Sequence, residues 1–149
     1  MIPGGRLRGS LLIFILVVAV TGLAIGLRSG GPANVSEVPA TLPKGGVIIS
    51  GQIVLKPLTP PPPVALSKAA AIEKARGYAT DRHFPATALE ASITAAGNSH
   101  VQNVPAWVVT FTSPKATNVS QGKTPLFVKH YSVAIDVRTG KLLVGFFTK

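Results

Sequence analysis

A strongly apolar, uncharged stretch lies near the start of the chain, and it restricts what the first part can fold into. Between Arg8 and Arg28 stand 19 residues without a charge, most of them Leu, Ile, Val or Ala. As a helix this stretch would be roughly 28 Å long, close to the ~30 Å hydrocarbon core of a bilayer. A helix satisfies its own backbone hydrogen bonds in lipid, so Gly22 and Gly26 are tolerated there. We therefore predict a transmembrane helix that contacts membrane lipid through residues 9–27, within a first region of residues 1–28.

The charges that flank this stretch predict its orientation. Arg6 and Arg8 precede it, and positive residues favour the cytoplasmic side of a membrane. The expected protein is a single-pass signal-anchor protein of the cell membrane, with its N-terminus in the cytoplasm and its C-terminal domain outside. A cleaved signal peptide would instead give a secreted protein. The apolar run is longer than most such peptides and no clear A-x-A site follows it, which favours the anchor, and a buried core helix is the third alternative.

Residues 29–66 are rich in proline and glycine. Eight of the 13 prolines lie there, four of them consecutive at residues 60–63. Proline has no backbone N–H and clashes with the preceding helical turn, and a run of prolines favours an extended polyproline II spacer. We predict a tether. Within it, residues 47–55 are rich in β-branched side chains, which favours an accessory strand, a surface-lying segment or a docking strand for a partner.

The remaining residues, 67–149, show first a helical and then a strand pattern. Ser67 can cap a helix that continues through an alanine-rich run to about Ala79. Apolar and polar side chains then alternate with period two over residues 89–95, 107–112, 127–137 and 142–146. Gly140 supplies a tight turn before the last of these. The predicted fold class is α+β, with one helix packed on a four-stranded antiparallel sheet, after the transmembrane helix.

Two segments of this domain resemble the PepSY family. They are Trp107–Phe111, which opens one strand with an aromatic residue, and Tyr131–Leu143, which carries Asp136 before a Thr-Gly turn. An alanine-rich helix precedes such strands in that family, as residues 67–79 do here. The resemblance covers roughly residues 67–147. It implies a small non-enzymatic exported domain that binds or restrains peptidases, or that senses something near the cell surface.

Residues that could carry chemistry are few. The chain has no cysteine, which excludes disulfides, thiol catalysis and Cys-ligated metals. His83, His100 and His130 are scattered, and the five carboxylates show no spacing that pairs two of them. We therefore expect no enzyme, with no catalytic, cofactor-binding or metal-binding residues and no cofactor. Asp136 is expected to accept hydrogen bonds from backbone amides in its turn, and Trp107 and Tyr131 to lie in the core or on the sheet face.

The charge of the chain is unbalanced. It has 15 Lys and Arg against 5 Asp and Glu, a net charge of +10; from residue 67 onward there are ten against four, a net of +6. Such a surface attracts anionic partners. We expect a membrane-anchored extracytoplasmic binding or regulatory module whose partner is a peptidase or sensor protein. The alternative is a basic structural anchor that adheres to anionic lipid or wall polymer. No nucleic-acid-reading motif is present, so nucleic acid is not an expected partner.

Overall fold

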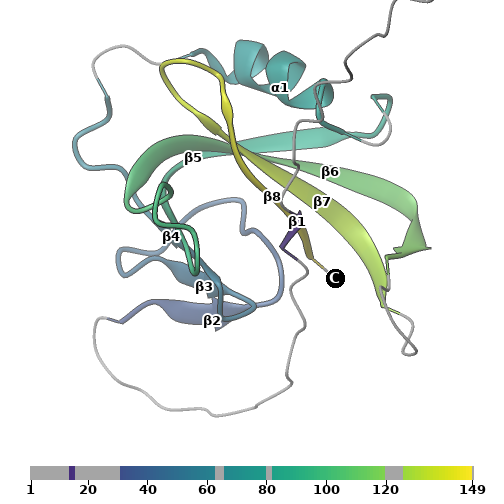
Figure 1. Ribbon diagram of the computed structural model, residues 1–149, viewed down its shortest axis with the longest axis horizontal. Coiled ribbons are helices and arrows are strands. Elements are labelled where there is room, and N and C mark those ends of the chain that lie inside the picture. Colours follow the sequence, from purple (N-terminus) through teal and green to yellow (C-terminus); the bar gives the residue numbers. More distant parts are fainter. Residues whose placement is uncertain (1–13, 16–30, 63–65, 80–81, 120–125, 149) are drawn as a thin grey trace, which may run out of the picture.

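Seven strands between Ala33 and Thr148, together with a two-residue strand near the N-terminus, form one mixed sheet (Figure 1). The computed structural model describes residues 14–15, 31–62, 66–79, 82–119 and 126–148. The strands are β1 Phe14–Ile15, β2 Ala33–Val35, β3 Val47–Ile49, β4 Ile53–Lys56, β5 Ala86–Ala95, β6 Val104–Asn118, β7 Phe127–Asp136 and β8 Leu142–Thr148, and the helix is α1 Lys68–Arg76. Their order in the sheet is β1-β8-β7-β6-β5-β4-β3-β2. The pairs β1–β8 and β2–β3 are parallel and the other neighbours are antiparallel.

The prediction of a transmembrane helix over residues 9–27 was wrong. Phe14–Ile15 is a strand, paired in parallel with Gly145 and Phe146 of β8. Among the described residues, no helix has both the length and the apolar character needed to cross a membrane. The other residues of 1–28 lie outside the described part of the chain. A short apolar run satisfies its backbone by strand pairing as well as by helix formation, and hydrophobicity alone does not separate the two.

The single-pass membrane localisation depended on that helix and is corrected with it. The inferred orientation, with a cytoplasmic N-terminus and an external C-terminal domain, had no other support than the helix and its flanking arginines. The secreted alternative depended on the same apolar segment, most of which lies outside the described residues.

The predicted four-stranded sheet was also wrong, because residues 33–56 add three strands to it. The accessory strand expected over residues 47–55 is a hairpin, in which β3 and β4 pair antiparallel from Val47↔Leu55 to Ile49↔Ile53. Three residues, 50–52, connect the paired Ile49 and Ile53. Ser50 and Gly51 take φ of 50° and 72° in this turn, the positive values that tight hairpin turns use. β4 then pairs with β5 from Ile53↔Ala95 to Lys56↔Ser92. The hairpin therefore joins the same sheet as β5–β8.

Helix α1 was predicted correctly and lies over one face of the sheet (Figure 1). Ser67 caps it by accepting a hydrogen bond from the Ala70 N–H at 3.2 Å. Its small buried residues, Ala71 and Ala75, allow close packing on β6 and β7. The core on this face is completed by Val109, Phe111, Tyr131, Val133 and Ile135.

A second core lies on the opposite face of the sheet, which β2–β4 curve toward (Figure 1). The hairpin contributes four of its buried side chains, and β5, β6, β7, β8 and the β5–β6 connection contribute the others. They are Val47, Ile49, Ile53, Leu55, Ala91, Ile93, Ala95, Val101, Ala106, Val108, Ala134, Val144 and Phe146. Because successive residues of a strand point to opposite faces, the same strands serve both cores. The region that was expected to be a tether thus forms one wall of the core.

Candidate functional site

Asp136 has the structural role that was predicted for it. Its Oδ1 accepts hydrogen bonds from the Arg138 N–H at 2.9 Å, the Thr139 N–H at 2.7 Å and the Thr139 hydroxyl at 3.0 Å. Burial acts to raise the pKa of Asp136, but the hydrogen bonds from Thr139 and Arg138 and the charge of Arg138 outweigh it and lower the pKa. The carboxylate thus stabilises the β7–β8 turn.

The other residues considered for chemistry are dispersed. His130 Nδ1 lies 3.1 Å from the Thr112 hydroxyl, and its Nε2 lies 3.9 Å from Glu37. Within the described residues, no three His, Asp or Glu side chains gather in a way that could hold a metal ion. The Trp107 indole N–H donates to the Leu66 carbonyl at 2.8 Å, and Tyr131 is buried beside Gly145 in the core under α1. Both aromatic residues therefore stabilise the fold.

The main feature that the sequence did not reveal is an open edge on β5. This strand has ten residues and pairs with β6 from Ala86 to Ile93, but β4 pairs only with its last part, from Ser92 to Ala95. Among the described residues, no strand pairs with residues 86–91 on the side away from β6. We call this side of residues 86–91 the β5 edge. The two parts of β5 differ in burial accordingly. Ala91, Ile93 and Ala95 are buried, whereas none of residues 86–90 is.

Hydrogen bonds at the two ends of β5 show which main-chain groups point to the β5 edge. The Pro85 carbonyl accepts from the Thr112 N–H of β6 at 3.0 Å, whereas the Ala96 N–H donates to the Gln52 carbonyl next to β4 at 2.8 Å. In an antiparallel sheet both main-chain groups of a residue point to one side, and the side alternates along the strand. The register on both sides of β5 is continuous. Ala86, Ala88 and Glu90 therefore direct their N–H and C=O groups to the β5 edge.

The chain that follows β4 runs beside this edge without closing it. Pro57 comes directly after the last paired residue, and Pro60, Pro61 and Pro62 follow. Proline has no N–H to donate to a strand ladder. Segment 57–62 thus ends β4 and leaves the main-chain groups of Ala86, Ala88 and Glu90 unmatched among the described residues.

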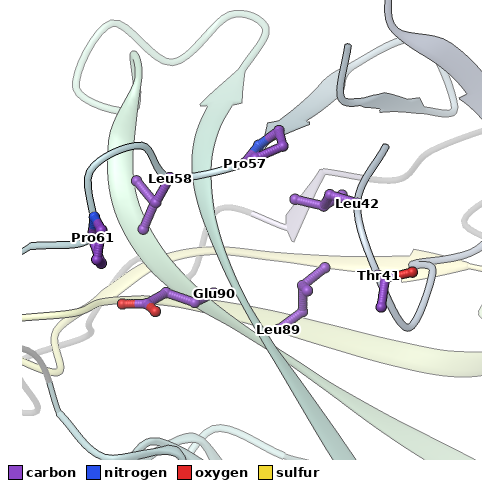
Figure 2. A pocket seen from close by; sticks show the side chains of 7 residues that line it. All are labelled: Thr41, Leu42, Pro57, Leu58, Pro61, Leu89 and Glu90. Atoms are coloured by element: carbon purple, nitrogen blue, oxygen red, sulfur yellow. The ribbon is translucent and has the colours of Figure 1, made fainter. Parts of the chain in front are cut away.

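A groove of about 320 Å³ lies between this segment and β5 (Figure 2). We call it the β5 groove, and its walls are Thr41, Leu42, Pro57, Leu58, Pro61, Leu89 and Glu90. Leu89 and Glu90 are consecutive residues of a strand, so their side chains point to opposite faces of the sheet. A groove that contacts both of them must lie off the edge of the strand, in line with the position that β4 vacates.

The β5 groove is mostly apolar, with one carboxylate. Leu42, Leu58, Leu89 and two prolines line it, and Glu90 supplies the only charge among its walls. Glu90 forms no ion pair with any described residue. The nearest cation in the register is Lys56, opposite Ser92, and its stem lies against Gly46.

One signal in the sequence could have indicated this site. The polar-apolar alternation of β5 extends back to residue 89, and the strand itself begins at residue 86. The prolines from residue 57 onward prevent β4 from pairing with this first part of β5. Two strands of unequal length leave an open edge, but the sequence alone does not show that these two strands are neighbours.

Comparisons with protein-family models, with curated proteins and with solved structures find no match for this chain. The PepSY resemblance thus rests only on the two short segments and the alanine-rich helix that suggested it. The four-stranded fold that accompanied it is contradicted by the seven strands between Ala33 and Thr148.

Proposed function

We propose that this protein binds an extended segment of a partner protein by adding it as a strand to the β5 edge. The observation that carries the proposal is the coincidence of two features at one place. Three residues direct main-chain hydrogen-bonding groups to the edge, and the β5 groove leaves space beside them. In strand addition, main-chain hydrogen bonds provide affinity and alternate side-chain pockets provide specificity.

The β5 edge is a free strand edge of a kind that proteins usually protect. An exposed edge invites pairing with any other chain, and proteins usually block it. Here segment 57–62 stands beside the edge, which hinders the approach of a whole second sheet. The β5 groove still admits a single extended chain. This arrangement favours selective capture of a peptide over general edge-to-edge association.

We propose that the partner bound at the β5 edge is a peptidase or a sensor protein. A regulatory module of that kind would hold an extended loop or terminus of its partner. Both classes of protein would bind in the same way, and the test is directed at this mode of binding.

The test measures amide hydrogen exchange with and without the capped pentapeptide Thr-Val-Thr-Val-Thr, at the highest soluble peptide concentration. We expect slower exchange of the amides of Ala86, Ala88 and Glu90, because they gain acceptors. The amides of Thr87 and Leu89 already face β6 and should not change. Absence of protection at the first three amides, with this peptide and its charged relatives described below, would contradict the proposal.

A proline at the edge provides the matching variant. Ala88→Pro removes one N–H that faces the groove and should abolish the protection, since edge positions tolerate proline. The control is Asn34→Pro on β2, the outermost strand beyond β4 and β3. The Ala33 N–H donates to Gly46, so Asn34 points away from β3, and this variant should bind as the wild type does.

A second candidate function, adhesion to anionic lipid or polymer, is favoured by the outer part of the β6–β7 pair. Phe127 is 58 % exposed, and Lys115 and Lys129 nearby are exposed as well. Exposed cations next to an aromatic residue suit a phosphate-rich partner. Sedimentation with vesicles of phosphatidylglycerol tests it. Binding should fall steeply with salt and with Lys115→Glu plus Lys129→Glu, but not with Lys68→Glu plus Lys74→Glu on α1.

A further inference from the structure

The β5 groove has two chemically different sides. Figure 2 shows Leu89 on the side of Thr41 and Leu42, and Glu90 on the side of Leu58 and Pro61. A strand added to the β5 edge sends successive side chains to opposite faces. Its residues would therefore meet the Leu42 side and the Glu90 side in turn.

Glu90 differs from the other described carboxylates in having no partner among the residues that the structure describes. Glu73 pairs with Arg76 at 3.2 Å, Glu37 lies 3.9 Å from His130, and Asp136 accepts three hydrogen bonds in its turn. In a chain of net charge +10, an acid without a counter-ion at the wall of an open groove leaves a place for a cation supplied by a ligand.

We propose that the captured segment reads apolar–basic–apolar at three consecutive positions, with the Lys or Arg directly opposite Glu90. This inference rests on the proposed function. The aliphatic stem of the basic side chain packs against Leu58 and Pro61, and its charge reaches Glu90. The two apolar neighbours point to the other face, where Leu42 and Leu89 line the groove.

The size of the effect follows from cross-strand pairing. An oppositely charged pair at directly opposite positions strengthens pairing by up to about fivefold, and a like-charged pair weakens it by a similar factor. A peptide with Lys opposite Glu90 should thus bind roughly tenfold more tightly than the same peptide with Glu there. A peptide with Thr at that position should fall between them.

The experiment compares three capped pentapeptides by fluorescence anisotropy on the full chain. They are Thr-Val-Lys-Val-Thr, Thr-Val-Thr-Val-Thr and Thr-Val-Glu-Val-Thr, which read the same in both directions, so strand orientation does not alter the order of their side chains. The wild type should prefer Lys over Thr over Glu. Glu90→Lys should reverse this order, and Glu90→Gln should nearly abolish the difference.

A control with the same change in net charge is Glu73→Lys, on the exposed surface of α1. It should leave the order of the three peptides unchanged. If Glu73→Lys reverses the order as Glu90→Lys does, the preference comes from overall charge and the inference is overturned.

The measurements distinguish strand addition from the preference for a basic side chain. If all three peptides protect the amides of Ala86, Ala88 and Glu90 but bind equally, strand addition stands and the apolar–basic–apolar pattern is overturned. If none of the three protects those amides, the proposed function fails, and this inference fails with it. Reversal of the preference by Glu90→Lys, together with protection of the three amides, supports both.

Discussion

The two faces of the sheet have cores that differ in how far apart their contributors lie in the sequence. The buried residues of the helix-covered face come from α1, β6 and β7, and all of them fall between Ala71 and Ile135. The opposite face depends on Val47, Ile49, Ile53 and Leu55, which come from a hairpin that precedes the helix and its proline-rich approach. A segment punctuated by proline and glycine can thus supply an essential wall of a core, and such a composition does not by itself mark a linker.

Removal of the β3–β4 hairpin should have the largest effect on stability. A fragment of residues 67–149 contains the complete helix-covered face, but its other face would expose Ile93, Val108 and Phe146 to water. We expect this fragment to lose cooperative thermal unfolding and to bind a hydrophobic dye. The control is a fragment that begins at residue 31 and keeps β2–β4. Cooperative unfolding of the shorter fragment would show that the helix-covered face is sufficient.

A matched pair of substitutions compares the two cores directly. Ile53 on β4 and Ile135 on β7 are both fully buried, on opposite faces of the sheet. Each change to alanine should cost about 2–5 kcal/mol of unfolding free energy, measured by denaturant titration. A loss at Ile135 without one at Ile53 would mean that the hairpin docks weakly on the sheet.

Alanine substitutions at two glycines test the turns that adjoin these cores. Gly140, in the β7–β8 turn under α1, and Gly97, after β5, have φ of 67° and 77°. Alanine at either position costs roughly 1–2 kcal/mol for the backbone. Gly140→Ala should cost more, because its Cβ would overlap the Lys74 side chain and lie 3.1 Å from Leu66 Cδ1, whereas Gly97 has open space. Equal unfolding free energies for the two variants would show that the Lys74 side chain moves aside at no energetic cost.

The smallest expected effect concerns the pH dependence of the β7–β8 turn. The folded-state pKa of Asp136 is lowered from its ordinary value of 3.8. The stability that the carboxylate contributes is therefore complete above that value, and is lost as the pH falls through the lower folded pKa. Denaturant titrations of the wild type and Asp136→Asn should differ at neutral pH and converge in acid. If the difference in unfolding free energy between the two proteins stays constant across this pH range, the stability of the turn does not depend on the ionisation of Asp136.

Local signals accounted for α1, for the alternation in β5–β8 and for the role of Asp136, because each depends on neighbours in the sequence. Ser67 lies three residues from the amide it caps, and Asp136 lies two and three residues from its donors. The hairpin at residues 47–56 was only partly predicted, since the turn at Ser50 and Gly51 was not recognised. The β5 edge was not predicted, because it arises from the unequal lengths of two strands that lie about 40 residues apart along the chain.

The sequence by itself determined where the helix starts, which side chains alternate along the later strands and how basic the chain is. Those properties follow from propensity, period and composition, which act over a few residues. The tertiary structure alone decided that residues 14–15 and 33–56 join the sheet and that β4 stops short of the start of β5. It also placed Glu90 beside a groove, with no counter-ion among the described residues. Strand pairing joins main-chain groups that every residue carries, so the partner of an edge is selected by packing of the whole sheet and not by the residues of the edge itself.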